Sequence, residues 1–262
     1  MRYAICQIQL VPGNPQANYK LVEQWVHAVM DAGEKPDILV LPEMWTTGYT
    51  LPDLSKIAEH DLETTLPFLQ DLARLHDVHV IGGSVANQRD GGIYNTALVV
   101  NKMGELVYEY DKAHLVPMLN EPAYLTEGDS IGHVFELDGI KMGVMICYDL
   151  RFPELARSLA LEGAQVLHIV AEWPEARTAH WQALQVARAI ENQCYVVSSN
   201  VIGTYDGVEF AGSSMVIDPW GDILAQAGKD NEETLKITLT LDQVPKVREE
   251  VPVFSSRRPD LY

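Results

Sequence analysis

Strand-like and helix-like patterns alternate along almost the whole of this chain, and that alternation limits the folds open to it. Short apolar runs typical of buried strands are separated by longer stretches in which apolar residues recur with helical spacing. Two pairs of runs flank short turns, which predicts hairpins: residues 91–100 with 106–111, and 134–137 with 141–146. We therefore expect an α/β protein with mixed sheets.

The faces of such a sheet must all be covered. Helical patterns at residues 14–30, 66–76, 153–162 and 179–192 can cover one side, and a second sheet packed on the other side completes a sandwich. No linker, repeat or shift in composition divides the 262 residues. We expect a single domain over residues 1–262 that ends in a polar tail at about residues 247–262.

The charge balance is acidic, because 37 Asp and Glu against 19 Lys and Arg give a net charge of −18. Nucleic acids and anionic membranes attract basic patches, and no run of Lys or Arg is present, so we expect neither as a partner. No run approaches the roughly 18 apolar residues of a membrane helix, and the first residues do not resemble a signal peptide. Three cysteines without framework spacing complete the pattern of a soluble, reduced, cytoplasmic protein.

One of these cysteines has a reactive setting. The apolar run before Cys147 ends there, and Pro153 opens a helical pattern soon afterwards, so Cys147 lies on a strand-to-helix turn. Such a turn exposes its side chain and directs backbone N–H groups toward the atom that the sulfur attacks. A free cysteine is more often a buried, inert residue, which is our interpretation of Cys6 and Cys194.

Two other strand ends carry charged residues that suit this thiol. Glu43 follows the run at 38–41, and Lys112 follows the run at 106–111. Strand ends are where α/β sheets collect functional groups. A thiol needs a base at neutral pH, and a desolvated carboxylate such as Glu43 can serve. A nearby lysine stabilises thiolate and oxyanion, whereas His114 and His180 are alternative partners for the sulfur.

Three blocks of residues resemble the signature blocks of the nitrilase superfamily of carbon–nitrogen hydrolases, in the same order and at similar spacing. They are Pro42-Glu43, Lys112-Ala113-His114-Leu115 and Ile146-Cys147-Tyr148-Asp149-Leu150-Arg151-Phe152-Pro153-Glu154. The resemblance extends from about residue 3 to residue 228. It implies a four-layer α-β-β-α sandwich that needs neither metal nor cofactor, and no metal-ligand cluster is evident in the sequence.

The same resemblance implies a role for each matching residue. Glu43 is expected to be the general base, Cys147 the nucleophile and Lys112 the cation beside the oxyanion. The backbone N–H of Tyr148 is expected to complete the oxyanion hole. Glu121, which precedes the Gly-Asp pair of residues 128 and 129, matches a second glutamate of the family. The resemblance implies that it positions substrate and lysine, and a proton relay is the alternative role.

The segment after the strand at residues 166–170 is a candidate for substrate binding. Its aromatic residues Trp173 and Trp181 can wall a pocket, and Arg177 can pair with a carboxylate of the substrate. Residues 44–49, including Tyr49, are further candidates for the lining. Core packing of the two tryptophans and a surface salt bridge of Arg177 are the alternatives.

The pattern Trp-Pro-x-x-Arg-x-x-His-Trp at residues 173–181, with the Cys147 block, resembles the bacterial ω-amidase branch of the superfamily. That branch deamidates small 2-oxo acid amides, such as 2-oxoglutaramate and 2-oxosuccinamate, to the dicarboxylic acid and ammonia. Carbamoyl-β-alanine or carbamoyl-amine hydrolases and nitrilases remain alternatives, as does a catalytically silent binding protein with the same fold. The resemblance also implies a homodimer through residues 153–162 and 251–254, although the apolar tail residues can equally cover their own domain.

Overall fold

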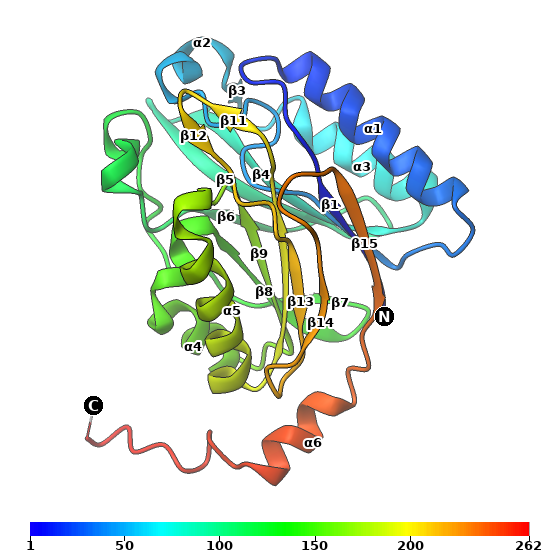
Figure 1. Ribbon diagram of the computed structural model, residues 1–262, viewed down its shortest axis with the longest axis vertical. Helices are drawn as coiled ribbons and strands as arrows, with labels where there is room; N and C mark the ends of the chain where they lie inside the picture. The colour runs from blue at the N-terminus through cyan, green and yellow to red at the C-terminus, as the bar shows by residue number, and fades with distance from the viewer. Residues whose placement is uncertain (262) are drawn as a thin grey trace.

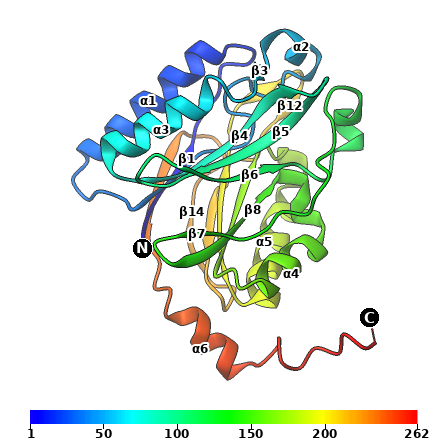
Figure 2. The same ribbon diagram turned by 180° about the vertical axis from the view of Figure 1, so that it is seen from behind.

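The computed structural model describes residues 1–261 and consists of two β-sheets packed face to face between two pairs of helices (Figure 1). Helices α1 (Pro15–Asp31) and α3 (Thr65–His76) cover one sheet. Helices α4 (Pro153–Leu161) and α5 (Thr178–Asn192) cover the other, and the view from behind shows the same layers (Figure 2). This confirms the predicted α-β-β-α sandwich.

The first sheet has the strand order β15-β1-β2-β4-β5-β6, and β3 pairs with β4 beside this path. Its strands are β1 (Arg2–Gln7), β2 (Ile38–Val40), β3 (Glu59–His60), β4 (His79–Arg89), β5 (Gly92–Val100), β6 (Leu106–Asp111) and β15 (Glu233–Thr238). Strands β1, β2 and β4 are parallel because helices α1 and α3 connect them as crossovers. Strands β5 and β6 form the first predicted antiparallel hairpin, and β4 also pairs antiparallel with β5.

The second sheet has the strand order β14-β13-β10-β9-β8-β7. Its strands are β7 (Phe135–Leu137), β8 (Ile140–Ile146), β9 (Val166–Ala171), β10 (Tyr195–Asn200), β13 (Met215–Ile217) and β14 (Ile223–Gln226). The central strands β8, β9 and β10 are parallel, with α4 and α5 as crossovers. A separate hairpin of β11 (Thr204–Tyr205) and β12 (Val208–Glu209) was not expected, because two-residue strands leave no periodic pattern.

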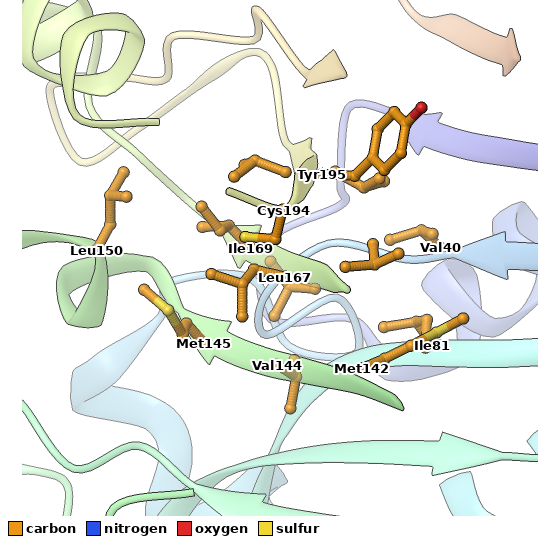
Figure 3. Close-up of a cluster of buried hydrophobic side chains, with 14 of the residues drawn as sticks. Val40, Ile81, Met142, Val144, Met145, Leu150, Leu167, Ile169, Cys194 and Tyr195 are labelled. Atoms are coloured by element: carbon orange, nitrogen blue, oxygen red, sulfur yellow. The ribbon is translucent and has the colours of Figure 1, made fainter. Parts of the chain in front are cut away.

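Side chains from the two sheets meet in one continuous apolar cluster. Val40 and Ile81 from the first sheet lie beside Met142 and Leu167 from the second (Figure 3). Strands β8 and β9 are almost uninterrupted apolar runs because helices cover one face of their sheet and the partner sheet covers the other. The carboxyl ends of β2, β8 and β9 are thereby held rigidly by packing on both faces.

The chain after β15 forms helix α6 (Gln243–Glu250), so the tail predicted from about residue 247 begins inside a helix. The helix was missed because only Val244 and Val247 of its eight residues are buried, which leaves a weak periodic signal. Farther along, the ring of Phe254 lies 5.3 Å from the Arg157 guanidinium of α4, so this part of the tail covers its own domain. Tyr262, the last residue of the predicted tail, lies outside the described residues. No helix within residues 1–261 is both long and apolar enough to cross a membrane.

Candidate active site

Glu43 comes three residues after the end of β2, and strand β4 holds the backbone on either side of it. The carbonyl oxygen of Pro42 accepts the N–H of Ser84 at 3.2 Å, and Ser84 Oγ accepts the N–H of Met44 at 3.1 Å. The β4–β5 register shifts between Ile81 and Ser84. Gly83, inside this irregularity, has a φ of +64°, and a Cβ there would collide with the Pro42 carbonyl oxygen. A glycine is required for this close approach.

Lys112 follows β6 and lies at the centre of a buried ion cluster. Its Nζ is 2.8 Å from Glu43 Oε1 and 2.8 Å from Glu121 Oε1, and none of the three side chains is exposed. Burial by itself lowers the pKa of Lys112, but the carboxylates of Glu121 and Glu43 outweigh it and raise the pKa well above its ordinary value. Lys112 is therefore a fixed cation.

Both carboxylates of the cluster are oriented by further donors. Asn95 Nδ2 donates to Glu43 Oε1 at 2.8 Å, and the backbone N–H of Glu172 donates to Glu43 Oε2 at 2.7 Å. The Tyr49 hydroxyl donates to Glu121 Oε1 at 2.6 Å, and a backbone N–H donates to its other oxygen, also at 2.6 Å. Charge-assisted bonds of this kind fix direction as well as distance. Short 3₁₀ turns place Glu121 in η3 (Glu121–Ala123), after η2 (Pro117–Leu119).

Cys147 is the first residue of the turn η4 (Cys147–Arg151) and has a φ of +45°, which is rare for a residue with a side chain. The buried carboxylate of Asp149 fastens this turn. One Asp149 oxygen accepts the Ile146 N–H at 3.0 Å and the Tyr110 hydroxyl at 2.9 Å. The other accepts the N–H of His114 at 3.2 Å and lies 2.7 Å from its Nδ1. The turn that carries the thiol is thereby tied to the loop that carries Lys112.

Neither histidine considered as a partner for the thiol serves it in this structure. His114 is engaged by Asp149, and its ring stacks on Phe152 with 3.6 Å between centroids. His180 Nδ1 lies 3.3 Å from a guanidinium nitrogen of Arg151. Of the charged groups around Cys147, Glu43 has the strongest effect on the pKa of the thiol.

The thiol of Cys147 is protonated in the unliganded site. Burial raises its pKa well above the ordinary value, and the charge of Glu43 adds to this rise, while Lys112 opposes it. The proton must therefore leave as the sulfur attacks, and the neighbouring carboxylate of Glu43 is the base that can accept it.

A cavity opens above Cys147, while Glu43, Lys112 and Glu121 lie behind it in the interior. Its walls combine apolar and aromatic side chains with two arginines, and they include the four residues predicted to contact substrate. The lining consists of Tyr49, Val116, Met118, Leu119, Cys147, Tyr148, Arg151, Glu172, Trp173, Pro174 and Arg177. Within residues 1–261, no group of three or more His, Cys, Asp or Glu side chains is arranged to hold a metal ion.

The structure distinguishes between the two interpretations of these residues, pocket lining and core packing. Trp173 is 2% exposed and lines the cavity, whereas Trp181 is fully buried and donates to the Ser213 carbonyl at 2.8 Å, as a core residue does. Of residues 44–49 only Tyr49 reaches the cavity. Trp45 packs instead against Tyr19, with 5.1 Å between ring centroids.

The two arginines give the cavity a cationic side. The Arg151 guanidinium lies 4.6 Å from the centre of the Trp173 ring. Burial, assisted by the charge of Arg177 and opposed by Tyr148, lowers the pKa of Arg151. Arg177 has no carboxylate partner among residues 1–261, because the nearby Glu175 lies 4.0 Å from Lys229 instead. In a protein of net charge −18, this unpaired guanidinium is suited to an anionic ligand.

Three residues of the site were missed from the sequence. Glu172 follows β9 directly, and Glu43 likewise comes shortly after β2, so the position of Glu172 at a strand end was a usable signal. Asn95 interrupts a largely apolar strand, which is a weaker signal. Arg151 lies in the Cys147 block, but nothing local indicates that its guanidinium stacks on Trp173.

The model of the carbon–nitrogen hydrolase family matches residues 2–249, and this chain belongs to that family. Its members are hydrolases of carbon–nitrogen bonds, so the predicted enzyme class and the resemblance to the nitrilase superfamily are both confirmed. A crystal structure of a carbon–nitrogen hydrolase from Helicobacter pylori G27 matches with a TM-score of 0.93 at 26% identity, and the match covers 100% of this chain and 96% of that one.

The names of two relatives specify an activity. A 2-oxoglutaramate amidase of Bacillus subtilis (strain 168) is 43% identical over 256 residues, which are 98% of this chain and 97% of that protein. A protein of Yersinia enterocolitica named an omega-amidase is 35% identical over 257 residues, which are 97% of this chain and 95% of that protein.

Proposed function

We propose that this protein is an ω-amidase that hydrolyses the terminal amide of 2-oxoglutaramate and 2-oxosuccinamate to the dicarboxylic acid and ammonia. One observation carries the proposal: a single cavity joins Cys147, backed by the Glu43–Lys112 pair, to the unpaired guanidinium of Arg177. An ω-amide of a dicarboxylic acid has the matching pair of ends, a reactive amide and a carboxylate. The names of the Bacillus and Yersinia relatives support the same substrate class.

In the first half of the reaction, the sulfur of Cys147 attacks the amide carbon while Glu43 takes the thiol proton. As the carbon–sulfur bond forms, the π electrons of the carbonyl move onto oxygen. The ammonium of Lys112 and the backbone N–H of Tyr148 stabilise that oxyanion. Because the two glutamates already hold Lys112 charged and oriented, this stabilisation requires no rearrangement when the charge develops.

Collapse of the tetrahedral intermediate breaks the carbon–nitrogen bond. The nitrogen takes the proton from Glu43 and leaves as ammonia, so that a thioester remains on Cys147. A water molecule then gives a proton to Glu43 and attacks the thioester carbon, which forms a second oxyanion in the same place. The carbon–sulfur bond breaks, the sulfur recovers the proton, and the carboxylic acid is released.

Glu121 acts as a positioning residue in this scheme. It bonds Lys112 on one side and the hydroxyl of the cavity residue Tyr49 on the other, so it couples the oxyanion cation to the pocket wall. Arg177 pairs with the carboxylate at the far end of the substrate. Trp173 and Tyr148 flank the carbon chain between the two ends, where they exclude water.

Ammonia release from a panel of small amides tests the proposal, with Cys147→Ala as the control. The panel contains 2-oxoglutaramate, 2-oxosuccinamate, succinamate, glutamine, carbamoyl-β-alanine and a simple nitrile. Strong turnover of the oxo acid amides that disappears in Cys147→Ala is expected. Turnover confined to the carbamoyl compound or the nitrile would agree with Cys147 as the nucleophile but would refute the proposed substrate class. No turnover at all, together with an unreactive thiol, would favour the silent binding protein.

We further propose that the enzyme is a cytoplasmic homodimer. The apolar side chains of Ile190, Trp220 and Ile223 are 50%, 43% and 48% exposed, and a Cβ added at Gly221 would meet Ile190, so helix α5 and this turn form one surface. An exposed apolar surface of this kind is typical of a protein–protein interface, which supports dimerisation. Sedimentation showing only monomer at micromolar concentration would refute it.

The three free cysteines, one of them the nucleophile, support a reducing compartment.

A further inference from the structure

Glu172 is a buried acid next to the reacting groups for which the mechanism above has no use. The residue is 2% exposed, and its Oε1 has no hydrogen-bond partner among residues 1–261. An unpaired polar atom in the interior is costly, so native proteins rarely keep one without a purpose. Glu172 also lines the cavity that contains Cys147.

The neighbours of Glu172 on its two sides define where it lies along the cavity. Its backbone N–H donates to Glu43 Oε2 at 2.7 Å, which places it beside the reacting groups. Trp173, Pro174 and Arg177 continue the same wall away from Cys147. Glu172 therefore lies on the wall between the reacting groups and Arg177, along which the carbon chain of an ω-amide runs toward its 2-oxo and carboxylate end.

The local charges favour the neutral form of Glu172. The ammonium of Lys112 is already bonded to Glu43 and Glu121, and within residues 1–261 it forms no ion pair with Glu172. Burial, reinforced by the charge of Glu43, raises the pKa of Glu172 well above its ordinary value, although Lys112 and a bond from the Tyr49 backbone oppose this rise. A neutral carboxylic acid retains an O–H that can donate a hydrogen bond, which an ionised one lacks.

The polar groups of the substrate and of the site can be matched one to one. The amide oxygen is held by Lys112 and the Tyr148 N–H, the amide nitrogen faces Glu43, and the carboxylate pairs with Arg177. The remaining polar atom of the substrate is the 2-oxo oxygen, which is a hydrogen-bond acceptor. Among the lining residues, the unpaired buried atoms are Glu172 Oε1 and a nitrogen of Arg151, which belongs to the cationic side of the cavity.

We propose that Glu172 is a specificity-determining residue, which donates a hydrogen bond from its side chain to the 2-oxo oxygen of the substrate. The inference rests on the proposed ω-amidase function and predicts a preference for oxo acids. An amide without the 2-oxo group leaves the buried carboxyl group unpaired, and sites built in this way reject such analogues strongly. The ammonium of a 2-amino acid amide, such as glutamine, has no lone pair to accept the bond.

The test compares kcat/KM for 2-oxoglutaramate with kcat/KM for glutaramate, which has the same chain without the 2-oxo group. Glu172→Met keeps the length of the side chain and removes the donor, so it should lower the preference for the oxo substrate about tenfold or more. Glu172→Gln keeps a donor in nearly the same shape and should retain the preference within about threefold. The loss in Glu172→Met should appear mainly as a higher KM, because the 2-oxo group does not change during the reaction.

Glu175→Met is the matched control, since Glu175 lies on the same segment but is half exposed and faces Lys229. It should leave both substrates unaffected. Glu172→Ala, a second variant without a donor, keeps the test decisive if Glu172→Met folds poorly in a thermal unfolding assay. Every variant preserves the bond to Glu43, because that bond comes from the backbone.

The outcomes distinguish this inference from the function on which it rests. A wild-type enzyme that does not hydrolyse 2-oxoglutaramate would overturn the proposed function. Equal kcat/KM values of the wild type for glutaramate and 2-oxoglutaramate would overturn the role of Glu172, because there would be no preference for it to determine. A wild-type preference that survives in Glu172→Met and Glu172→Ala would overturn the role of Glu172 alone. Equal losses for both substrates would do the same, because they would make Glu172 a structural residue.

Discussion

Replacement of Lys112 by methionine should damage both stability and catalysis, because one ammonium performs both tasks. Its Nζ lies 2.8 Å from Glu43 and 2.8 Å from Glu121, and all three side chains are fully buried. Lys112→Met retains most of the side-chain volume but leaves two buried carboxylates without their cation. Removal of one partner of a buried ion pair costs about 3–5 kcal/mol. Since a domain is stable by about 5–15 kcal/mol, the variant should fold with a large part of its stability lost.

The catalytic loss follows from the same geometry. Loss of one oxyanion donor costs about 10²- to 10³-fold in kcat. Urea unfolding followed by tryptophan fluorescence measures the first effect, and ammonia release from 2-oxoglutaramate measures the second. In Lys112→Met with Glu121→Gln, one unpaired charge is removed, so part of the stability should return while kcat stays low.

Lys102→Met is the control for loss of a lysine that is paired at the surface. Lys102 Nζ is 2.8 Å from Asp138, but the side chains are 38% and 44% exposed, so the free energy of unfolding should change by no more than about 1 kcal/mol. If Lys112→Met unfolds at the same urea concentration as the wild type, the buried cluster is not a charged network. If its kcat falls only a few-fold, Lys112 is not the oxyanion cation.

Three further predictions test other parts of the site. Burial and the charge of Glu43 raise the pKa of the Cys147 thiol, so its alkylation by iodoacetamide should still be accelerating above about pH 9, where thiolate forms. Glu43→Gln should move that rise to lower pH. Peptide mass spectrometry showing a wild-type plateau below about pH 8 would contradict this. Arg177→Ala should raise KM for 2-oxoglutaramate about tenfold or more and spare an uncharged amide such as propionamide, whereas equal effects on both would make Arg177 structural. Gly83→Ala should lose about 1–3 kcal/mol more stability in urea than Gly91→Ala, because both residues have positive φ but only a Cβ at Gly83 collides with Pro42; equal losses would refute the collision.

Much of the fold could be predicted from the sequence because it depends on local patterns. Strands β8 and β9 are apolar runs, and helix α5 has apolar residues at helical spacing. Each is long enough for its pattern to be recognised in the sequence. Helix α6 and the hairpin of β11 and β12 were missed for the opposite reason, since short or weakly amphipathic elements are held by their surroundings.

For the site, the sequence by itself determined which strands end in a reactive side chain. Glu43, Lys112 and Cys147 each come after a predicted strand, and this local pattern is sufficient to nominate them. The resemblance to a known family added Glu121, which no local pattern indicates.

Only the tertiary structure decided how these residues meet. Lys112 and Glu43 are 69 positions apart, and their 2.8 Å contact depends on the strand order and on the bulge at Gly83. The burial of Glu172, with one oxygen unpaired, likewise depends on what other parts of the chain place around it. A sequence pattern records which face of an element a side chain occupies, whereas burial and charge pairing are set by neighbours that the fold brings from distant positions. For this reason the chemistry could be nominated from the sequence, but its electrostatics could not.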